Sequence, residues 1–313
     1  TVENVKKQLD LMSMFKVNTM HFHLTEDQGW RIEIKKYPKL TSIGGYRLQG
    51  DGSTYGGFYT QDEIKDIVAY AAKRYITVIP EIDLPGHMMA AIAAYPYLSC
   101  KGEQWTPRMV WGVEDIVMCP GKEDMFNFLE DVVREVVPLF PGKYFHIGGD
   151  ECPKTSWKNC PTCQKRIQAE GLQADGKHSA EERLQSYVIK RMEKMLAKYD
   201  RKIIGWDEIL EGGLSPDATV MSWRGTSGGI SAALQKHDVI MTPGSGGLYL
   251  DHYQGDYKIE PVTIPSAPAY LSRTYNYEPV PDTIKSLGLE KHILGVQCNN
   301  WSEYMYTNAK MEY

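Results

Sequence analysis

The sequence predicts an α/β fold of the TIM (β/α)8 barrel type, on three observations. Short apolar segments that suit buried strands alternate with amphipathic helical segments, no linker-like stretch divides the 313 residues, and acids and tryptophans gather just after the strand segments. The pattern begins with a helix, so we expect a single barrel domain over residues 1–313 that lacks the first strand and the last helix. A doubly wound open sheet is the alternative, but no glycine-rich phosphate-binding turn follows an early strand.

The helical segments are recognised by their apolar spacing and their first residues. Apolar residues recur at helical spacing from Val2 to Phe15, and capping boxes at 60–63 and 179–182 begin two later helices. Further helices are expected at 124–137 and 230–236, with a weak one at 283–287. The expected strands cover residues 18–24, 76–79, 144–147, 202–205, 218–221, 239–241 (resuming at 248–250) and 293–297.

Charge and hydropathy exclude several classes of function. The chain carries 35 Lys and Arg against 40 Asp and Glu, which gives a net charge of −5. A general binder of nucleic acid or of an anionic membrane normally has the opposite sign. No apolar run approaches the roughly 18–20 residues that span a bilayer. We therefore expect neither a nucleic-acid partner nor a membrane span.

The six cysteines are too few for a disulfide-built scaffold. Cys160-Pro-Thr-Cys163, with Cys152 upstream, is similar to part of a zinc site, but no fourth ligand stands at metal spacing. Free or partly paired cysteines are therefore predicted. A disulfide between Cys100 and Cys119 is the alternative in an oxidising compartment.

Polar residues follow each predicted strand, where a parallel barrel builds its active site. Acids stand after six of the seven strands and Trp after three, which is more than solvated loops need. These segments cover residues 25–28, 81–87, 146–151, 206–208, 223–224, 249–251 and 299–303.

The segment Gly148-Gly149-Asp150-Glu151 joins two flexible residues to two adjacent carboxylates. Adjacent carboxylates at a strand end point in different directions, so they can serve different roles. A pair of carboxylates is the usual equipment for glycoside hydrolysis. A helix N-cap is the alternative for this segment alone.

The motif His-Ile-Gly-Gly-Asp-Glu at 146–151 resembles the signature of the family 20 glycoside hydrolases, the β-N-acetylhexosaminidases. The resemblance extends over most of the chain in the family's order. It includes the segments 23–30, 83–87, 205–208, 221–223, 249–251 and 297–303.

The resemblance implies an exo-acting, retaining enzyme that removes terminal β-linked N-acetylglucosamine or N-acetylgalactosamine. The substrate's own acetamido oxygen would be the nucleophile and would form an oxazolinium intermediate. Glu151 would be the general acid and then the base, and Asp150 would hold the acetamido N–H. Tyr249 would donate to the acetamido carbonyl.

The resemblance also implies the sugar-binding set. Trp206, Trp223 and Trp301 would wall the sugar and its acetamide, and Asp251 and Glu303 would bind its hydroxyls. Asp27 and His87 would be substrate-binding positions near the acid and the sugar. His146 would lie behind the catalytic pair, with a buried structural histidine as the alternative. No cofactor and no metal are implied, and an extracytoplasmic location (periplasmic, secreted or lysosomal) is expected. The family's first-strand arginine has no counterpart here, since Arg31, Arg47 and Arg224 do not match its motif.

Three rival functions remain. A metal-dependent barrel hydrolase would use His21 and His23 with His87 and His146, although carboxylates and Trp dominate the strand ends. A non-catalytic carbohydrate-binding relative would have lost its acid, yet Asp150 is followed by an intact Glu at 151. A family 18 chitinase would need a spaced run of acids on one strand, which is not found.

Overall fold

The structure is a computed structural model that describes residues 1–264, 266, 268–305 and 307–312. The chain forms two compact units. The first contains Thr1–Ile204 and Glu211–Pro216, and the second contains Gly205–Leu210 and Asp217–Tyr313. The single domain expected over residues 1–313 stays a prediction.

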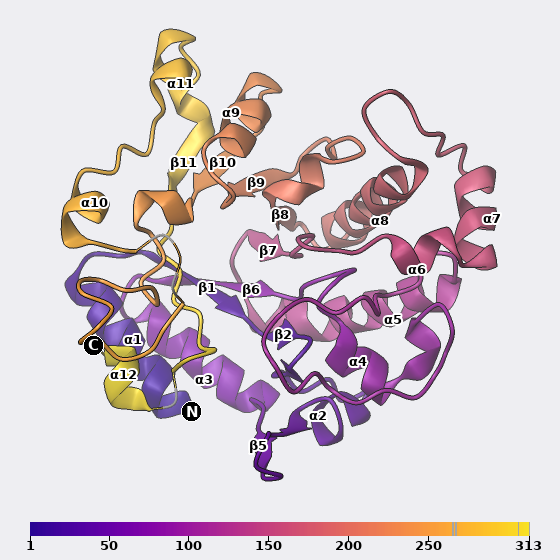
Figure 1. The fold of residues 1–313 in the computed structure, drawn as a ribbon, viewed down its shortest axis with the longest axis horizontal. Coiled ribbons are helices and arrows are strands. Elements are labelled where there is room, and N and C mark those ends of the chain that lie inside the picture. Colours follow the sequence, from indigo (N-terminus) through magenta and orange to yellow (C-terminus); the bar gives the residue numbers. More distant parts are fainter. Residues whose placement is uncertain (265, 267, 306, 313) are drawn as a thin grey trace. The chain divides into compact units, whose positions relative to one another are not determined.

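The first unit is built on parallel strands in the order β1-β6-β7-β8 (Figure 1). These are β1 (Thr19–His23), β6 (Thr77–Glu81), β7 (Tyr144–His146) and β8 (Lys202–Trp206), which passes into the second unit at Gly205. The register pairs His23 with Glu81 and Glu81 with His146. His23, Glu81 and His146, the last residues of β1, β6 and β7, therefore lie side by side in that order.

Four longer helices belong to this unit: α1 (Val2–Met14), α3 (Gln61–Ala72), α5 (Glu123–Val136) and α8 (Ala180–Ala197). Both predicted capping boxes are confirmed. The Glu63 N–H donates to Thr60 Oγ1 (3.2 Å), and the Thr60 N–H donates back to Glu63 Oε2 (2.7 Å). Such reciprocal bonds satisfy two donors that a helix start otherwise leaves open.

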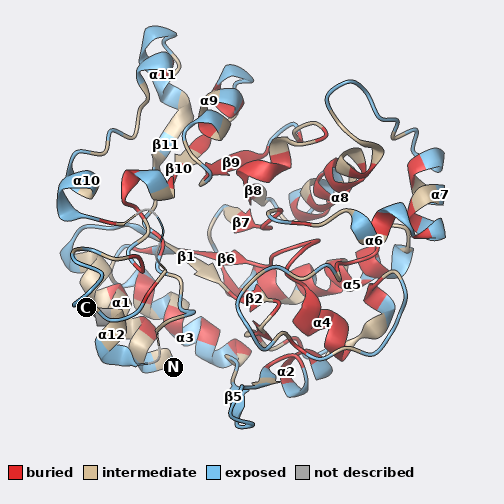
Figure 2. Cartoon of the chain, viewed as in Figure 1, coloured by how far each residue is buried: buried red, intermediate tan, exposed pale blue. Residues whose placement is uncertain are grey.

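Several short elements were not predicted. The helix α4 (Met89–Ala94) is buried at every position, so it has no polar face that would reveal its period (Figure 2). The remaining helices of this kind are α2 (Lys39–Ser42), α6 (Thr155–Lys158), α7 (Pro161–Ala169), η1 (Pro96–Leu98) and η2 (Val137–Leu139). Two small antiparallel pairs, β2 (Thr25–Glu26) with β3 (Gly29–Trp30) and β4 (Tyr46–Leu48) with β5 (Thr54–Gly56), complete the unit.

The second unit continues from the end of β8 through β9 (Thr219–Ser222), β10 (Val239–Met241) and β11 (Ile293–Val296) in that order. Strand β10 pairs in parallel with both β9 and β11. The prediction that a strand resumes at 248–250 is wrong, because Tyr249 forms only an isolated parallel bridge with Asn299. The helices are η3 (Asp207–Leu210), α9 (Ser227–Leu234), η4 (Gly244–Gly246), α10 (Leu271–Tyr275), α11 (Asp282–Ser286), η5 (Glu290–His292) and α12 (Asn308–Glu312).

The predicted α/β class is confirmed, because parallel strands alternate with helices in both units. Within the part of the chain that the structure describes, no helix combines the length and the apolar character needed to cross a membrane.

Candidate active site

Glu81 is the centre of a histidine cluster at the ends of β1, β6 and β7. Its side chain is completely buried, and its Oε2 lies 2.6 Å from His23 Nδ1 and 2.9 Å from His21 Nε2. The other oxygen, Oε1, lies 3.0 Å from His146 Nδ1. Burial alone would raise the pKa of Glu81, but the charges of His146, His23 and His21 outweigh it and hold that pKa well below its usual range.

This arrangement bears on the alternative that the protein is a metal-dependent barrel hydrolase. The four histidines that it would use face carboxylates: three of them face Glu81, and His87 faces Glu26 and Asp27. A histidine bound to a carboxylate is a common supporting pair. The structure therefore gives each of these histidines a carboxylate partner, although the ligand atoms of His21, Glu81 and His146 also lie within 4.8 Å of one another, as a metal site would need.

The turn after β6 is held against the turn after β7. The Asp83 N–H donates to Thr25 Oγ1 (2.9 Å), and Asp83 Oδ1 accepts from the Gly149 N–H (3.2 Å). A Cβ on Gly148 would collide with Asp83 Oδ1, so only glycine fits there. On the other side, Gln185 Nε2 of α8 donates to the Gly149 carbonyl (2.6 Å). The backbone that carries the two candidate carboxylates is fixed from both sides.

This turn has an unusual backbone. Gly148 and Gly149 have positive φ angles of 65° and 96°, and Glu151, which is not glycine, has φ 41°. A left-handed residue with a side chain costs free energy and persists only where its surroundings enforce it. The side chain of Asp150 is 17% exposed and that of Glu151 is 43% exposed. Asp150 is thus the more enclosed carboxylate, and Glu151 the more accessible one.

His87 lies between two groups of acids. Its Nδ1 lies 2.7 Å from Glu26 Oε1, while its Nε2 lies 3.5 Å from Asp150 Oδ2 and 3.6 Å from Glu151 Oε2. Burial disfavours the imidazolium, but Glu26 and Asp150 raise the pKa of His87 well above its usual value. His87 is accordingly a buried cation beside the candidate acid.

The pKa of Glu151 is raised, chiefly because burial penalises the carboxylate. His87 opposes this shift, and the negative charge of Asp150 adds to it. A glutamic acid that keeps its proton above the ordinary range is suited to donate it to a leaving group.

Asp27 and His146 support the site from within. Asp27 is completely buried, and its carboxylate accepts from the backbone N–H groups of Met89 (2.9 Å) and Glu114 (3.2 Å). Burial raises the pKa of Asp27. This environment favours a positioning role for Asp27 over direct sugar contact. His146 is also completely buried.

The second unit positions Trp223 through two acids that follow β8. The Trp223 Nε1–H donates to Glu208 Oε2 (2.9 Å), and its backbone N–H donates to Asp207 Oδ2 (3.2 Å). Arg224 Nε donates to Asp207 Oδ1 (2.5 Å). Glu208 is therefore a support for the indole of Trp223.

The other sugar-binding candidates of this unit follow β8, β10 and β11. The rings of Trp206 and Trp301 lie 6.1 Å apart between centroids, at 46°. Burial raises the pKa of Asp251, although His252 and the backbone N–H of Trp301 oppose that shift. The structure thus brings Trp206, Asp251 and Trp301 into one group.

Tyr249 and Glu303 lie on loops of the same unit. The Tyr249 ring packs edge-on against His252, with centroids 5.1 Å apart, and its backbone is tied to Asn299 by the isolated bridge. The Leu250 N–H donates to the Asn299 carbonyl (2.8 Å). Glu303 is exposed on a turn.

Sequence reasoning placed Glu26, Glu81, Asp83 and Asp207 in the polar segments after the strands but gave none of them a role. The signal was their position, two to four residues after a predicted strand. The reason for the omission is physical: their partners come from other strands, and sequence spacing does not show which charges face one another.

Comparison with known proteins identifies the family of the chain. The profile of "Glycosyl hydrolase family 20, catalytic domain" matches residues 1–313. A beta-hexosaminidase of Porphyromonas gingivalis is 59% identical over 315 residues, which cover 100% of this chain and 39% of that protein. One of Vibrio furnissii is 39% identical and covers 100% of this chain and 52% of that protein. The chain therefore spans about half or less of the length of these relatives.

Two solved structures are also similar to this chain over almost its whole length. The GH20 exo-β-N-acetylglucosaminidase from Vibrio harveyi, in complex with N-acetylglucosamine, has a TM-score of 0.86 and 34% identity, covering 99% of this chain and 51% of that one. The β-N-acetylhexosaminidase from Bacteroides fragilis has a TM-score of 0.82 and 34% identity, covering 99% and 60%. The predicted barrel class is confirmed by these neighbours. The chain belongs to glycosyl hydrolase family 20.

Proposed function

We propose that the protein is an exo-acting β-N-acetylhexosaminidase that removes terminal β-linked N-acetylglucosamine or N-acetylgalactosamine from glycans. One observation carries the proposal. Glu151 is an accessible carboxyl group with a raised pKa, it is adjacent to the more enclosed Asp150, and both lie on a turn that is fixed on two sides.

The proposed chemistry retains the anomeric configuration and uses the substrate's acetamido group. Protonated Glu151 donates to the glycosidic oxygen as the C–O bond breaks, while the acetamido oxygen bonds to the anomeric carbon. Water then opens the oxazolinium ring, and the Glu151 carboxylate takes its proton. Because the nucleophile is part of the substrate, much of the entropy cost of bringing the reactants together is avoided.

Asp150 would accept the acetamido N–H and stabilise the positive charge that develops on nitrogen. The setting of its Oδ1 supports this role, because this atom is buried and has no hydrogen-bond partner among the described residues. A buried polar atom without a partner costs free energy unless a ligand satisfies it. The other carboxylate oxygen of Asp150, Oδ2, lies 3.5 Å from His87 Nε2.

For the second unit we propose the roles that the family resemblance implies. Tyr249 donates to the acetamido carbonyl, Trp206, Trp223 and Trp301 pack on the sugar, and Asp251 and Glu303 accept from its hydroxyls. The support from the structure is the enclosed setting of Trp206 and the two-acid anchor of Trp223. We also propose an extracytoplasmic location, which cell fractionation can test.

The deciding experiment measures release of a chromogenic leaving group from β-linked N-acetylglucosamine, N-acetylgalactosamine and 6-sulfated N-acetylglucosamine. Turnover of at least one of the three, absent in Asp150→Ala, is expected. A folded protein that binds these sugars without turnover would instead support the non-catalytic relative. Zinc-dependent turnover without dependence on Asp150 would support the metal-dependent hydrolase.

A further inference from the structure

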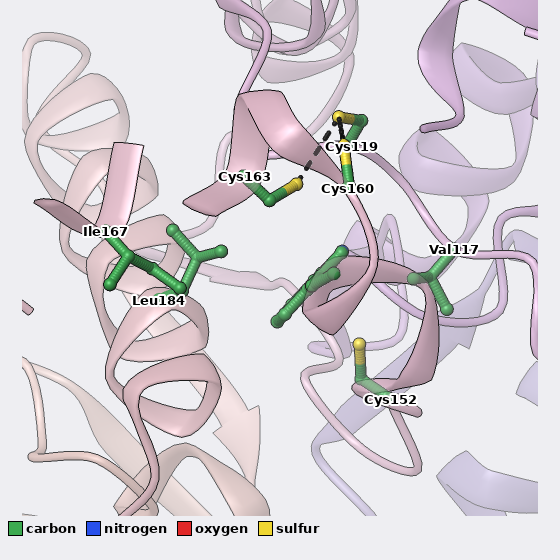
Figure 3. Packing of buried hydrophobic residues seen from close by; sticks show 8 residues of the cluster. Val117, Cys119, Cys152, Cys160, Cys163, Ile167 and Leu184 are labelled. Carbon is green, nitrogen blue, oxygen red and sulfur yellow. Dashed lines mark hydrogen bonds between the residues drawn. The ribbon is translucent and has the colours of Figure 1, made fainter. Parts of the chain in front are cut away.

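Four cysteines of the first unit converge outside the candidate active site. They are Cys100, Cys119, Cys160 and Cys163, called here the four-cysteine cluster. Cys119 Sγ lies 3.5 Å from Cys163 Sγ and 3.8 Å from Cys160 Sγ (Figure 3). Cys100 Sγ lies 3.8 Å from Cys163 Sγ. All four Sγ atoms lie within 4.8 Å of one another. Cys152, the third cysteine noted in the sequence, is not one of them.

These distances match a metal site and not a pair of disulfides. A disulfide joins two sulfurs at about 2.0 Å, and all six cysteines are free thiols. A tetrahedral zinc ion with Zn–S bonds of about 2.3 Å separates its four sulfurs by about 3.8 Å. Three of the six separations, at 3.5–3.8 Å, are those of such a tetrahedron, and the other three are within 4.8 Å.

Two local structures present the thiols in pairs. Cys160 is the N-cap of α7 and Cys163 lies in its first turn, so the Cys-Pro-Thr-Cys segment forms a compact corner at a helix start. Ser99 and Met118 form an antiparallel bridge, and each immediately precedes one of the other two cysteines. The two pairs come from segments about 40 residues apart, which explains why sequence spacing did not show a fourth ligand.

Gly121 allows the two pairs to meet. A Cβ at this position would lie 2.5 Å from the Cys163 backbone nitrogen, so any larger residue would push the turn after Cys119 away from α7. Such a close approach of backbone to backbone is a specific use of glycine.

The surroundings suit a site of net negative charge. A divalent cation with four thiolates carries a net charge of −2, and Cys160 and Cys163 lie at the start of α7, which is the positive end of the helix dipole. Lys122 Nζ donates to the carbonyl of Ser99 (2.6 Å), the residue before Cys100. Thr162 Oγ1 lies 3.0 Å from Cys160 Sγ, within reach for a hydrogen bond to a thiolate.

We propose that the four-cysteine cluster is a structural zinc site. Zinc displaces four thiol protons to solvent, and four Zn–S bonds replace four S–H bonds. All four positions are filled by protein, so no position is left for substrate or water, and the site is structural rather than catalytic.

The zinc site stabilises the loops behind the candidate acid. It ties the segment 100–119 to the segment 160–163, which follows Glu151 by nine residues. Between the two, Trp157 Nε1 donates to the Met118 carbonyl (2.8 Å), and the Met118 N–H donates to the Pro85 carbonyl (3.0 Å). Pro85 begins the short turn that ends at His87. The zinc site therefore fixes the loop that carries His87 and the loop that carries Glu151.

The test measures metal in the protein purified without chelator, by mass spectrometry of the elements. About one zinc per chain is expected. Cobalt exchanged into the site should give the intense visible bands of tetrahedral cobalt thiolate. Cys160→Ser combined with Cys163→Ser should remove both signals, and Cys152→Ser, a buried control in the same hydrophobic cluster, should retain them.

Four outcomes would overturn the proposal. They are wild-type protein without zinc that also fails to take up cobalt, disulfides within the cluster in unreduced protein, iron in place of zinc, and equal metal loss in the Cys152→Ser control. If the paired serine variant does not fold, the zinc content and the cobalt spectrum of the wild-type protein decide the question alone. Neither measurement depends on hydrolytic activity, so the zinc site and the proposed function can fail separately.

Discussion

The imidazole of His87 lies 3.6 Å from the carboxylate of Glu151. Glu26 and Asp150 keep this imidazole protonated, and its positive charge opposes the rise that burial causes in the pKa of Glu151. The pKa of the candidate acid is therefore set by a balance between its own burial, a neighbouring cation and a neighbouring anion. The first prediction removes the cation.

His87→Gln should move the alkaline limb of the pH profile of kcat/KM to higher pH. The substitution removes a positive charge beside Glu151, so its pKa rises and the acid stays protonated further into the alkaline range. The limb is measured with an uncharged chromogenic substrate. An unchanged or lowered limb in the folded variant would show that His87 does not act on the proton of Glu151.

Glu151→Gln should lower kcat on the order of 100- to 10,000-fold, because the amide cannot donate the proton. Binding of a thiazoline analogue of the cyclised acetamide should stay within about threefold, since the analogue needs no proton transfer. Calorimetric titration measures the second quantity. Glu103→Gln, on an exposed loop, is the control and should keep full activity. Turnover near wild type in Glu151→Gln would assign the acid to another residue.

Glu81→Gln should lower the free energy of unfolding by about 3 kcal/mol, because three histidines lose the buried charge that they face. Urea unfolding followed by circular dichroism measures this. The matched control is Glu130→Gln, which breaks a surface pair with Lys198 and should cost no more than about 1 kcal/mol. Equal losses of unfolding free energy in the two variants would show that the buried charge of Glu81 stabilises the fold no more than a surface ion pair does.

Stability should be highest between about pH 4.5 and 6.5. The folded-state pKa of Glu26 is lowered from 4.5 to about 2, so its contribution is present above pH 4.5 and is lost as the pH falls toward 2. The folded-state pKa values of His23 and His87 are raised above 6.5, so their contributions are present below 6.5 and are lost as the pH rises through the folded values. Melting temperatures across the pH range check this, and a maximum above pH 8 would contradict it.

Glu208→Ala should raise KM about tenfold with a smaller change in kcat, because the indole of Trp223 loses the acceptor that orients it. Glu208→Gln keeps an acceptor oxygen and should restore most of the loss. Initial-rate kinetics on one N-acetylhexosaminide separate the two constants. If Glu208→Gln is as impaired as Glu208→Ala, the charge and not the hydrogen bond is what matters.

The sequence was most informative where local chemistry decides the structure. The capping boxes at Thr60 and Ser179 were predicted correctly, because a hydroxyl and a glutamate three residues apart satisfy the same helix start. The seven strands were also predicted, although 248–250 was not a strand. There the backbone is satisfied by one bridge between Tyr249 and Asn299.

The sequence was least informative where partners are distant along the chain. Glu81 and His146 are 65 residues apart, and only the strand register makes them neighbours. Cys100 and Cys163 meet only because a β-bridge and a helix start approach across Gly121. The helix α4 gave no pattern at all, because a helix buried on every side has no periodicity in its polarity.

The most direct test of the account compares hydrolysis of β-linked aryl N-acetylglucosaminides whose acetamide carries zero to three fluorine atoms. Each fluorine weakens the carbonyl oxygen as a nucleophile without changing the leaving group. If the acetamido oxygen attacks the anomeric carbon, kcat/KM falls steeply and in order along the series. A rate that does not depend on fluorination, or no hydrolysis of the parent compound, would contradict the proposed mechanism.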